Sequence, residues 1–283
     1  VGGRLVPLLL KSGYRVRVMG RSLDKLSCRP WASDPNVALV QADMLDRASL
    51  ERAVRGCWAA FYLVHSMIAQ KKGFADADRT SARNMLAAAA AQDLERIIYL
   101  GGLGDVNHPD MSEHLRSRHE VGNILRSGPV PVTVLRAAMI LGSGSASFEM
   151  LRYLVERLPV MITPSWSRHR AQPIAIEDVI AYLLAAREVP LNASQVVEIG
   201  GPDQVSYADL MRIYAEECGL RRPMLPVPVL SPRLSSYWLA FITPLQARVG
   251  AKLIGSIRHD TVVDDPEPAL AFGVTPRGVR EAV

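Results

Sequence analysis

Cysteine is scarce in this sequence, and long apolar runs and basic clusters are missing. The three cysteines, Cys28, Cys57 and Cys218, are unclustered and form no CxxC pair. This pattern favours a reducing compartment and argues against a disulfide framework or a zinc site. The apolar stretches are too short or too interrupted to span a bilayer, and the residues given carry no signal or transit pattern. We therefore expect a cytoplasmic protein without a bound metal.

The charge is modestly basic and evenly scattered. Lys and Arg number 33 against 28 Asp and Glu, which gives a net charge of +5. No basic run carries interleaved aromatic residues, so nucleic acid is not an expected partner. The excess suits an anionic small molecule or weak association with a surface. At 283 residues and 49% apolar, the chain can bury a large core in one extended domain or two modest ones.

Strands and helices are expected to alternate over the first half of the chain. Short apolar runs predict strands within 14–19, 37–46, 57–66, 96–104 and 130–142, and helical spacing predicts helices within 5–10, 49–57, 77–93 and 113–128. Asp78 and Thr80 are plausible N-caps, and 21–31 is expected to be a polar turn. Such alternation is typical of parallel β–α–β units with right-handed crossovers. The predicted fold class is therefore α/β, a Rossmann-type doubly wound parallel sheet.

The pattern changes after Gly144, where helices, loops and prolines replace the regular alternation. We expect residues 1–145 to form the dinucleotide-binding sheet domain, with a strand and a helix in 172–200 returning to it. Residues 146–171 and 201–283 are expected to form a smaller C-terminal lobe for a substrate or partner. The amphipathic stretch 235–245 either packs inside this lobe or meets a membrane surface or a protein partner.

The opening VGGRLVPLLL reads as the end of a glycine-rich turn running into a helix. In a nucleotide-binding β–α–β unit this turn lets phosphates approach the free N–H groups at the helix N-terminus. Gly2 and Gly3 are then the tail of the turn, or alternatively a flexible start.

Ligands of open parallel sheets bind outside the carboxyl ends of the strands, so the residues there are candidates for the site. Arg21 can pair with the 2′-phosphate of NADP, which an acidic residue would not do, or it is a solvated surface residue. Asp43, next to Met44, can accept a hydrogen bond from the adenine amino group, or it serves only in a turn or cap.

Later strand ends add further candidates nearer the nicotinamide. Near the pyrophosphate and the nicotinamide ribose we expect Leu63, Val64, His65 and Ser66. His65 is either catalytic or a hydrogen-bonded structural residue. Gly101 and Gly102 allow close approach of a ligand or form an ordinary turn.

The helix within 113–128 carries three residues that suit acid–base or anion chemistry. His114 and Arg118 stand four residues apart on one face, and His119 follows. A histidine can exchange protons near neutral pH, and an arginine can hold an anion. The alternative is a helix face exposed to water.

The order of elements resembles the atypical extended short-chain dehydrogenase/reductases, over almost the whole chain. The similarity rests on VGGRLVPLLL, GR, FYLVHSM, YLGGLG, SRHEVG and GSGSASFEMLRYLVERLPVMITPSW. Within that family the chain is similar to the NmrA-like NAD(P)H-binding group and to the NADPH-binding accessory subunit of respiratory complex I. The resemblance implies NADP(H) as cofactor, with NAD less favoured. It also implies that a first strand and two fingerprint glycines precede these residues, with Gly2 as the third glycine.

The resemblance also implies a catalytic Ser, a Tyr and a Lys four residues after the Tyr, and this sequence departs from that triad. Arg118 stands at the Lys position, His114 at the Tyr position, and the Ser position falls within Gly101–Gly102. A slip of one residue puts His119 at the Lys position instead. Ala138 and Met139 match the nicotinamide-side segment of the family.

Three functions follow from the resemblance. The first is hydride transfer between NADP(H) and a quinone or small carbonyl substrate. The second is a non-catalytic NADP(H)-sensing or assembly module that binds a protein partner, which the missing triad favours. The third, a sugar-nucleotide epimerase, shares the fold but needs the catalytic Tyr.

Overall fold

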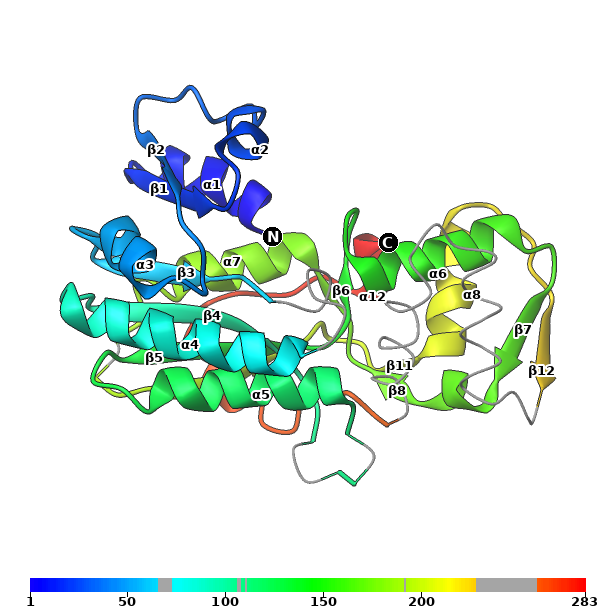
Figure 1. The fold of residues 1–283 in the computed structure, drawn as a ribbon. Coiled ribbons are helices and arrows are strands. Elements are labelled where there is room, and N and C mark those ends of the chain that lie inside the picture. The colour runs from blue at the N-terminus through cyan, green and yellow to red at the C-terminus, as the bar shows by residue number, and fades with distance from the viewer. Residues whose placement is uncertain (66–72, 106–107, 110, 191, 228–258) are drawn as a thin grey trace. The chain divides into compact units, whose positions relative to one another are not determined.

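The computed structural model describes residues 1–65, 73–105, 108–109, 111–190, 192–227 and 259–283 (Figure 1). They divide into two units, each described by itself. Unit 1 comprises 1–101, 119–135 and 180–197, and unit 2 comprises 102–118, 136–179 and 198–283. The predicted domain boundaries, with a division near 145, stay a prediction. Ser66 and the stretch 235–245 lie outside the described residues.

Unit 1 carries most of the parallel strands. Its elements are α1 (Gly2–Lys11), β1 (Val16–Gly20), α2 (Leu23–Ser27), β2 (Val37–Gln41), α3 (Arg47–Val54), β3 (Ala59–Tyr62) and α4 (Phe74–Ala91). The elements that extend from one unit into the other are β4 (Arg96–Gly102), α5 (Glu113–Arg126), β5 (Val132–Ala137), α7 (Ile176–Ala185) and β10 (Gln195–Ile199). Strands and helices alternate along this part of the chain, which confirms the predicted α/β class.

The strands form two pieces of sheet. β1 pairs in parallel with β2, and a second sheet has the order β10-β5-β4-β3, in which β3 pairs in parallel with β4. Among the described residues no strand pairs with the second edge of β1 or of β3. Both strands therefore keep one open edge, although they belong to the same unit.

The core of unit 1 explains why these segments form helices and strands. Leu5, Val6 and Leu9 bury one face of α1, and Gly13, with φ of 81°, allows the turn into β1. In the centre of the core, the rings of Tyr62 and Tyr99 meet edge to face with centroids 5.5 Å apart.

Three local predictions are wrong. Gly2 and Gly3 lie in the first turn of α1, so they are neither the tail of a turn nor a flexible start. A short helix, α2, forms where a polar turn was expected, because Ser22 caps it by accepting a hydrogen bond from the Lys25 N–H at 3.5 Å. The helix α4 begins at Phe74, so Asp78 and Thr80 lie inside it and are not N-caps. Its N-cap is Gly73, whose left-handed conformation, with φ of 72°, starts the helix earlier than the polar residues suggested.

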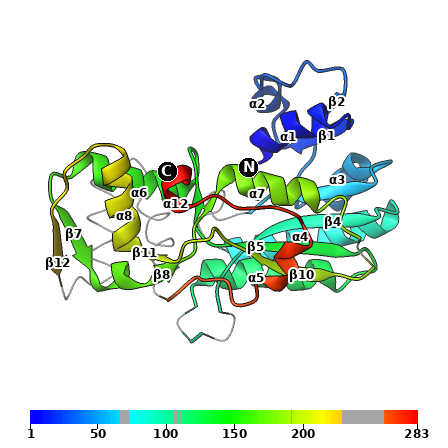
Figure 2. The same cartoon turned by 180° about the vertical axis from the view of Figure 1, so that it is seen from behind.

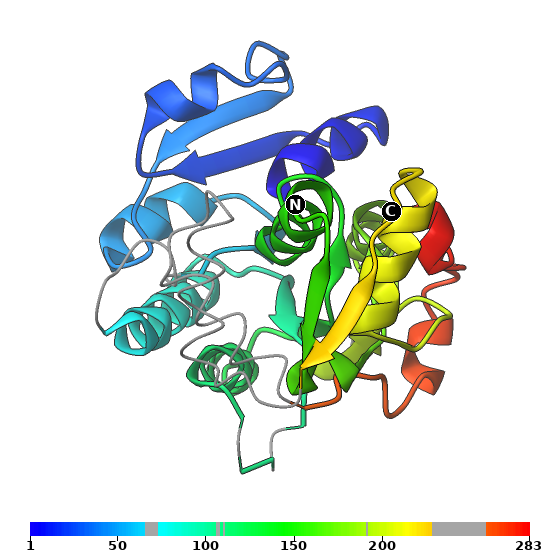
Figure 3. The ribbon, with the colours of Figure 1, turned by 90° about the vertical axis from the view of Figure 1, so that its right-hand side faces the viewer.

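Unit 2 consists of short strand pairs and helices. The remaining elements are β6 (Ile140–Leu141), α6 (Ala146–Arg157), β7 (Met161–Pro164), the 3₁₀ helix η1 (Ser165–Arg168), β8 (Arg170–Ala171), β9 (Ile174–Ala175), β11 (Val205–Ser206), α8 (Tyr207–Glu217), β12 (Met224–Val227), α11 (Glu267–Leu270) and α12 (Val279–Ala282). β6–β9 and β7–β12 are parallel pairs, and β8–β11 is antiparallel. Figure 3 brings β7 and β12 to the front, and Figure 2 shows α12 in red near the yellow α8, which it contacts.

None of the described helices combines the length and the apolar character that crossing a membrane requires.

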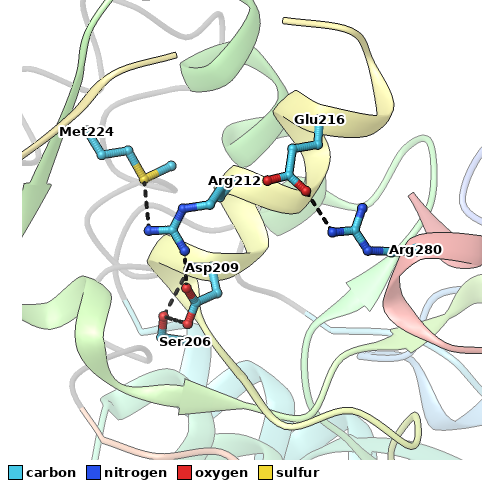
Figure 4. Close-up of polar contacts among 6 residues, drawn as sticks. All are labelled: Ser206, Asp209, Arg212, Glu216, Met224 and Arg280. Carbon is cyan, nitrogen blue, oxygen red and sulfur yellow. Dashed lines mark hydrogen bonds and ion pairs between the residues drawn. The ribbon is translucent and has the colours of Figure 1, made fainter. Parts of the chain in front are cut away.

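Ser206 caps α8 and also lowers the pKa of a neighbouring carboxyl (Figure 4). Its hydroxyl accepts a hydrogen bond from the Asp209 N–H at 3.0 Å and donates one to the Asp209 carboxylate at 2.6 Å. The Ser206 hydroxyl is the main favourable contact that holds the pKa of Asp209 below its ordinary value, and Arg212 adds to it. The start of α8 is therefore most stable when Asp209 is ionised.

We expect Ser206→Ala to lower the free energy of unfolding by about 1 kcal/mol at pH 7, the usual cost of losing an N-cap. The pKa of Asp209 is lower in the folded protein, so its stabilising effect is present above the unfolded pKa and is lost as pH falls through the folded pKa. The difference between wild type and variant should therefore shrink in acid. Urea melts at a series of pH values measure it, and a difference that grows in acid would contradict the account.

Candidate functional site

The carboxyl ends of β1 and β2 are tied together by hydrogen bonds. The Gln41 side-chain amide donates to the Arg21 carbonyl at 3.2 Å, and the Ala42 N–H donates to the Gly20 carbonyl at 3.1 Å. The Arg21 side chain is exposed, and it makes no hydrogen bond or ion pair to any part of the chain that the structure describes. Arg21 is thus an exposed cation whose guanidinium has no partner among the described residues.

The helix α2 fixes the direction of the chain immediately after Arg21. A Cβ on Gly20 would lie 3.2 Å from the Leu26 side chain, so α2 packs closely over the last residue of β1. Ser22, the next residue after Arg21, caps that helix. Arg21 therefore stands between a strand end and a helix start, both held by local contacts.

The first turn of α1 carries two glycines with few neighbours beside them. A Cβ on Gly2 would meet only Leu63 Cδ1, at 3.8 Å, and a Cβ on Gly3 would have nothing within 4 Å. The first N–H groups of a helix have no partners within the helix. The structure therefore brings Gly2 beside Leu63, as a site at the strand ends requires, and leaves open space at Gly3.

Asp43 forms the turn that follows β2. Its carboxylate accepts a hydrogen bond from the Leu45 N–H at 3.0 Å, and its own N–H donates to the Ser49 hydroxyl at 3.0 Å. Met44 is buried, and its carbonyl accepts from the Asn84 side chain at 2.9 Å. The turn role is thus confirmed, while contact of Asp43 or Met44 with an adenine stays a prediction.

Val64 and His65 are exposed after the end of β3. Their contact with a cofactor stays a prediction, and so does the catalytic alternative for His65.

In unit 2, Gly102 and Arg118 lie side by side. A Cβ on Gly102 would collide with Leu115 Cδ2 at 2.8 Å and would lie 3.9 Å from Arg118 Cβ and Cγ. A side chain at 102 would therefore have to displace the end of the Leu115 side chain, whether or not a ligand approaches. In unit 1, a Cβ on Gly101 would meet the Tyr99 ring at 3.4 Å.

The alternative that α5 exposes its polar face to water is wrong for Arg118 and His119. Their side chains are only 9% and 6% exposed, respectively, and His114 is partly buried. An arginine side chain can hold an oxygen or an anion but is not suited to donating a catalytic proton.

The nicotinamide-side candidates are held by backbone hydrogen bonds within unit 2. The Ile174 N–H donates to the Met139 carbonyl at 3.0 Å, and the Leu103 N–H donates to the Ala137 carbonyl at 2.8 Å, next to Ala138. Neither Ala138 nor Met139 brings an ionisable side chain. Their part in a site rests on backbone and shape and stays a prediction.

Tyr207 is not among the residues that the sequence indicates for the site, and its pKa does not suit the proton-donating role of the expected triad tyrosine. Its burial raises the pKa of its hydroxyl to about 12, although the neighbouring Thr261 acts in the opposite direction. A tyrosine that serves in proton transfer needs its pKa lowered toward the working pH.

Among the described residues no three His, Cys, Asp or Glu side chains are grouped so as to hold a metal ion.

Comparisons with known proteins agree with this arrangement. A family model described as NAD(P)H-binding matches residues 1–152. Among curated proteins no sequence matches the chain. Among solved structures, the chain is similar to the triphenylmethane reductase of Citrobacter sp. complexed with NADP(H), with a TM-score of 0.78 and 16% identity, covering 100% of this chain and 95% of that one.

Two further solved structures share the fold. An NADPH-dependent quinone oxidoreductase from Escherichia coli, complexed with NADPH, has a TM-score of 0.76 and 17% identity, and the match covers 98% of this chain and 93% of that one. A nucleoside-diphosphate-sugar epimerase from Staphylococcus aureus has a TM-score of 0.76 and 14% identity, covering 99% of this chain and 94% of that one. At such low identities the similarity concerns the fold alone.

Proposed function

Because the chain belongs to the NAD(P)H-binding family, we propose that it binds NADP(H) through Arg21 and transfers hydride to a quinone or a small carbonyl compound. The family match confirms the expected resemblance and the expected cofactor class. The preference for NADP over NAD and the reaction are the proposal.

The proposal rests on the guanidinium of Arg21, which has no partner among the described residues. A dinucleotide-binding fold that selects NAD places an acidic residue at the end of the strand that corresponds to β1 here. That acidic residue binds the ribose 2′-hydroxyl. Here that place holds an arginine, whose planar fork suits a phosphate and which makes no internal ion pair within the described residues. The open space beside Gly3 fits the pyrophosphate of the same cofactor.

For the reaction, the bound cofactor supplies a hydride, and the chain has to position the acceptor and provide a proton. Arg118 can hold a ribose hydroxyl or the developing negative charge on the acceptor oxygen. It cannot supply the proton, which then comes from His114 or from water. A quinone or an activated carbonyl suits this set of residues, because such acceptors need less help from a strong general acid.

A second candidate is a non-catalytic module that binds NADP(H) and reports its redox state to a protein partner. It is favoured by the same positions that weaken the enzyme: the glycines at 101 and 102, within which the catalytic serine is expected, and the arginine at 118, where a lysine is expected.

The two candidates are separated by measuring NADPH oxidation by the purified full-length protein with a panel of quinones, aldehydes and ketones. We expect turnover above background with at least one acceptor, and we expect Arg118→Ala to reduce it about tenfold to a hundredfold, because one stabilising charge is removed. Tight NADPH binding without turnover across the panel would overturn the enzyme and leave the sensing module.

A further inference from the structure

The helix α1 contains a proline that leaves one of its carbonyl groups without the regular partner. In an α-helix the carbonyl of Gly3 accepts from the N–H of residue 7, but residue 7 is Pro7, which has no N–H. The indole N–H of Trp31 donates to this same carbonyl at 3.3 Å. A side chain from a different segment thus replaces the hydrogen bond that the proline removes.

Trp31 belongs to the connection between β1 and β2, residues 21–36, which also carries Arg21. This connection is shaped by its own short bonds, because the Ala32 N–H donates to the Arg29 carbonyl at 2.9 Å and the Asp34 N–H donates to the Trp31 carbonyl at 3.2 Å. Trp31 is partly buried. Its bond to Gly3 links the connection to the first turn of α1, within one unit of the structure.

We propose that Trp31 is a positioning residue that sets the selectivity for NADPH over NADH. By bonding to the carbonyl that Pro7 leaves free, it holds the Arg21 connection at a fixed distance from the first turn of α1. This inference rests on the proposed function, in which Arg21 binds the 2′-phosphate and the first turn of α1 binds the pyrophosphate. Both groups belong to one ligand, so the two parts of the protein must keep one spacing.

The role of Trp31 predicts an effect on one cofactor only. NADH has no 2′-phosphate, so its binding does not depend on where the connection holds Arg21. Trp31→Phe keeps an aromatic ring but removes the N–H. We expect it to raise the Kd for NADPH about twofold to tenfold, as the loss of one neutral hydrogen bond would, and to leave the Kd for NADH within about twofold.

Pro7→Ala separates positioning from simple stabilisation. With alanine at position 7, the Gly3 carbonyl regains its partner within the helix, so Trp31→Phe should no longer lower the melting temperature in that background. The double variant still lacks the bond from residue 31 to the Gly3 carbonyl, so its NADPH selectivity should stay low. Recovery of selectivity together with stability would overturn the positioning role.

The experiment measures the Kd of both cofactors and the melting temperature of the four proteins: wild type, Trp31→Phe, Pro7→Ala and the double variant. Trp58→Phe is the matched control, since Trp58 is exposed just before the amino end of β3, and it should change neither Kd. If the wild type prefers NADPH over NADH and Trp31→Phe keeps that preference, this inference alone is overturned. A wild type that binds neither cofactor would overturn the proposed function and this inference with it.

Discussion

Replacing Arg21 with glutamine is expected to weaken NADPH binding about tenfold to a hundredfold, because a phosphate then loses its charge-assisted hydrogen bonds. NADH binding should stay within about twofold, since that cofactor offers no 2′-phosphate to the side chain. The folded protein should lose no stability, because the Arg21 guanidinium has no internal partner in the described part of the chain. Isothermal titration of each cofactor into wild type and variant measures the effect.

Arg15→Gln is the matched control for this prediction. Arg15 is also exposed and makes no side-chain hydrogen bond or ion pair with described residues, but it precedes β1 and so stands at the strand's opposite end. Arg15→Gln therefore removes the same charge as Arg21→Gln at a position outside the candidate site. Equal weakening of NADPH binding by the two variants would mean that overall charge, not a contact at Arg21, attracts the cofactor.

Replacing Gly201 with alanine is expected to reduce the free energy of unfolding by about 2 to 3 kcal/mol, a cost typical of overpacking a filled interior. A Cβ there would lie 2.5 Å from the Pro173 carbonyl oxygen and 3.3 Å from that of Arg277. These are backbone atoms, and the Pro173 carbonyl already accepts the Gly201 N–H at 2.8 Å. Neither neighbour can move aside without breaking local bonds.

Gly3→Ala is the control for that substitution, because a Cβ on Gly3 would meet nothing within 4 Å. Alanine is the better helix former, so this variant should be as stable as wild type or slightly more stable. Chemical denaturation of both variants gives the comparison. If Gly201→Ala unfolds at the wild-type midpoint, the close packing of 173, 201 and 277 is not as described.

The fold could be predicted from the sequence because the relevant signals are local. Apolar runs and helical spacing repeat along the first half of the chain, and their alternation is enough to indicate a parallel α/β sheet. The sequence indicates Arg21 as a candidate in the same way, since it follows directly on a strand. The helix boundary at Phe74 was missed because a glycine in a left-handed conformation, not a polar side chain, precedes it.

The contacts that shape the candidate site depend on residues far apart in the chain, and no local pattern gives them. Pro7 and Gly3 stand four residues apart, a visible sign that one carbonyl lacks a partner, but nothing in the sequence indicated Trp31 as the donor. Likewise, the sequence offered a ligand or a turn as the reason for Gly102. The structure supplies a third reason, the Leu115 side chain 2.8 Å from where a Cβ would be.

Binding of NADP(H) through the cofactor's 2′-phosphate can be tested by a single titration. NADPH and NADH are titrated separately into the purified full-length protein, and the two values of Kd are compared. We expect NADPH to bind at least about tenfold more tightly than NADH, the factor expected of a charged phosphate contact. Equal affinities, or tighter binding of NADH, would contradict it.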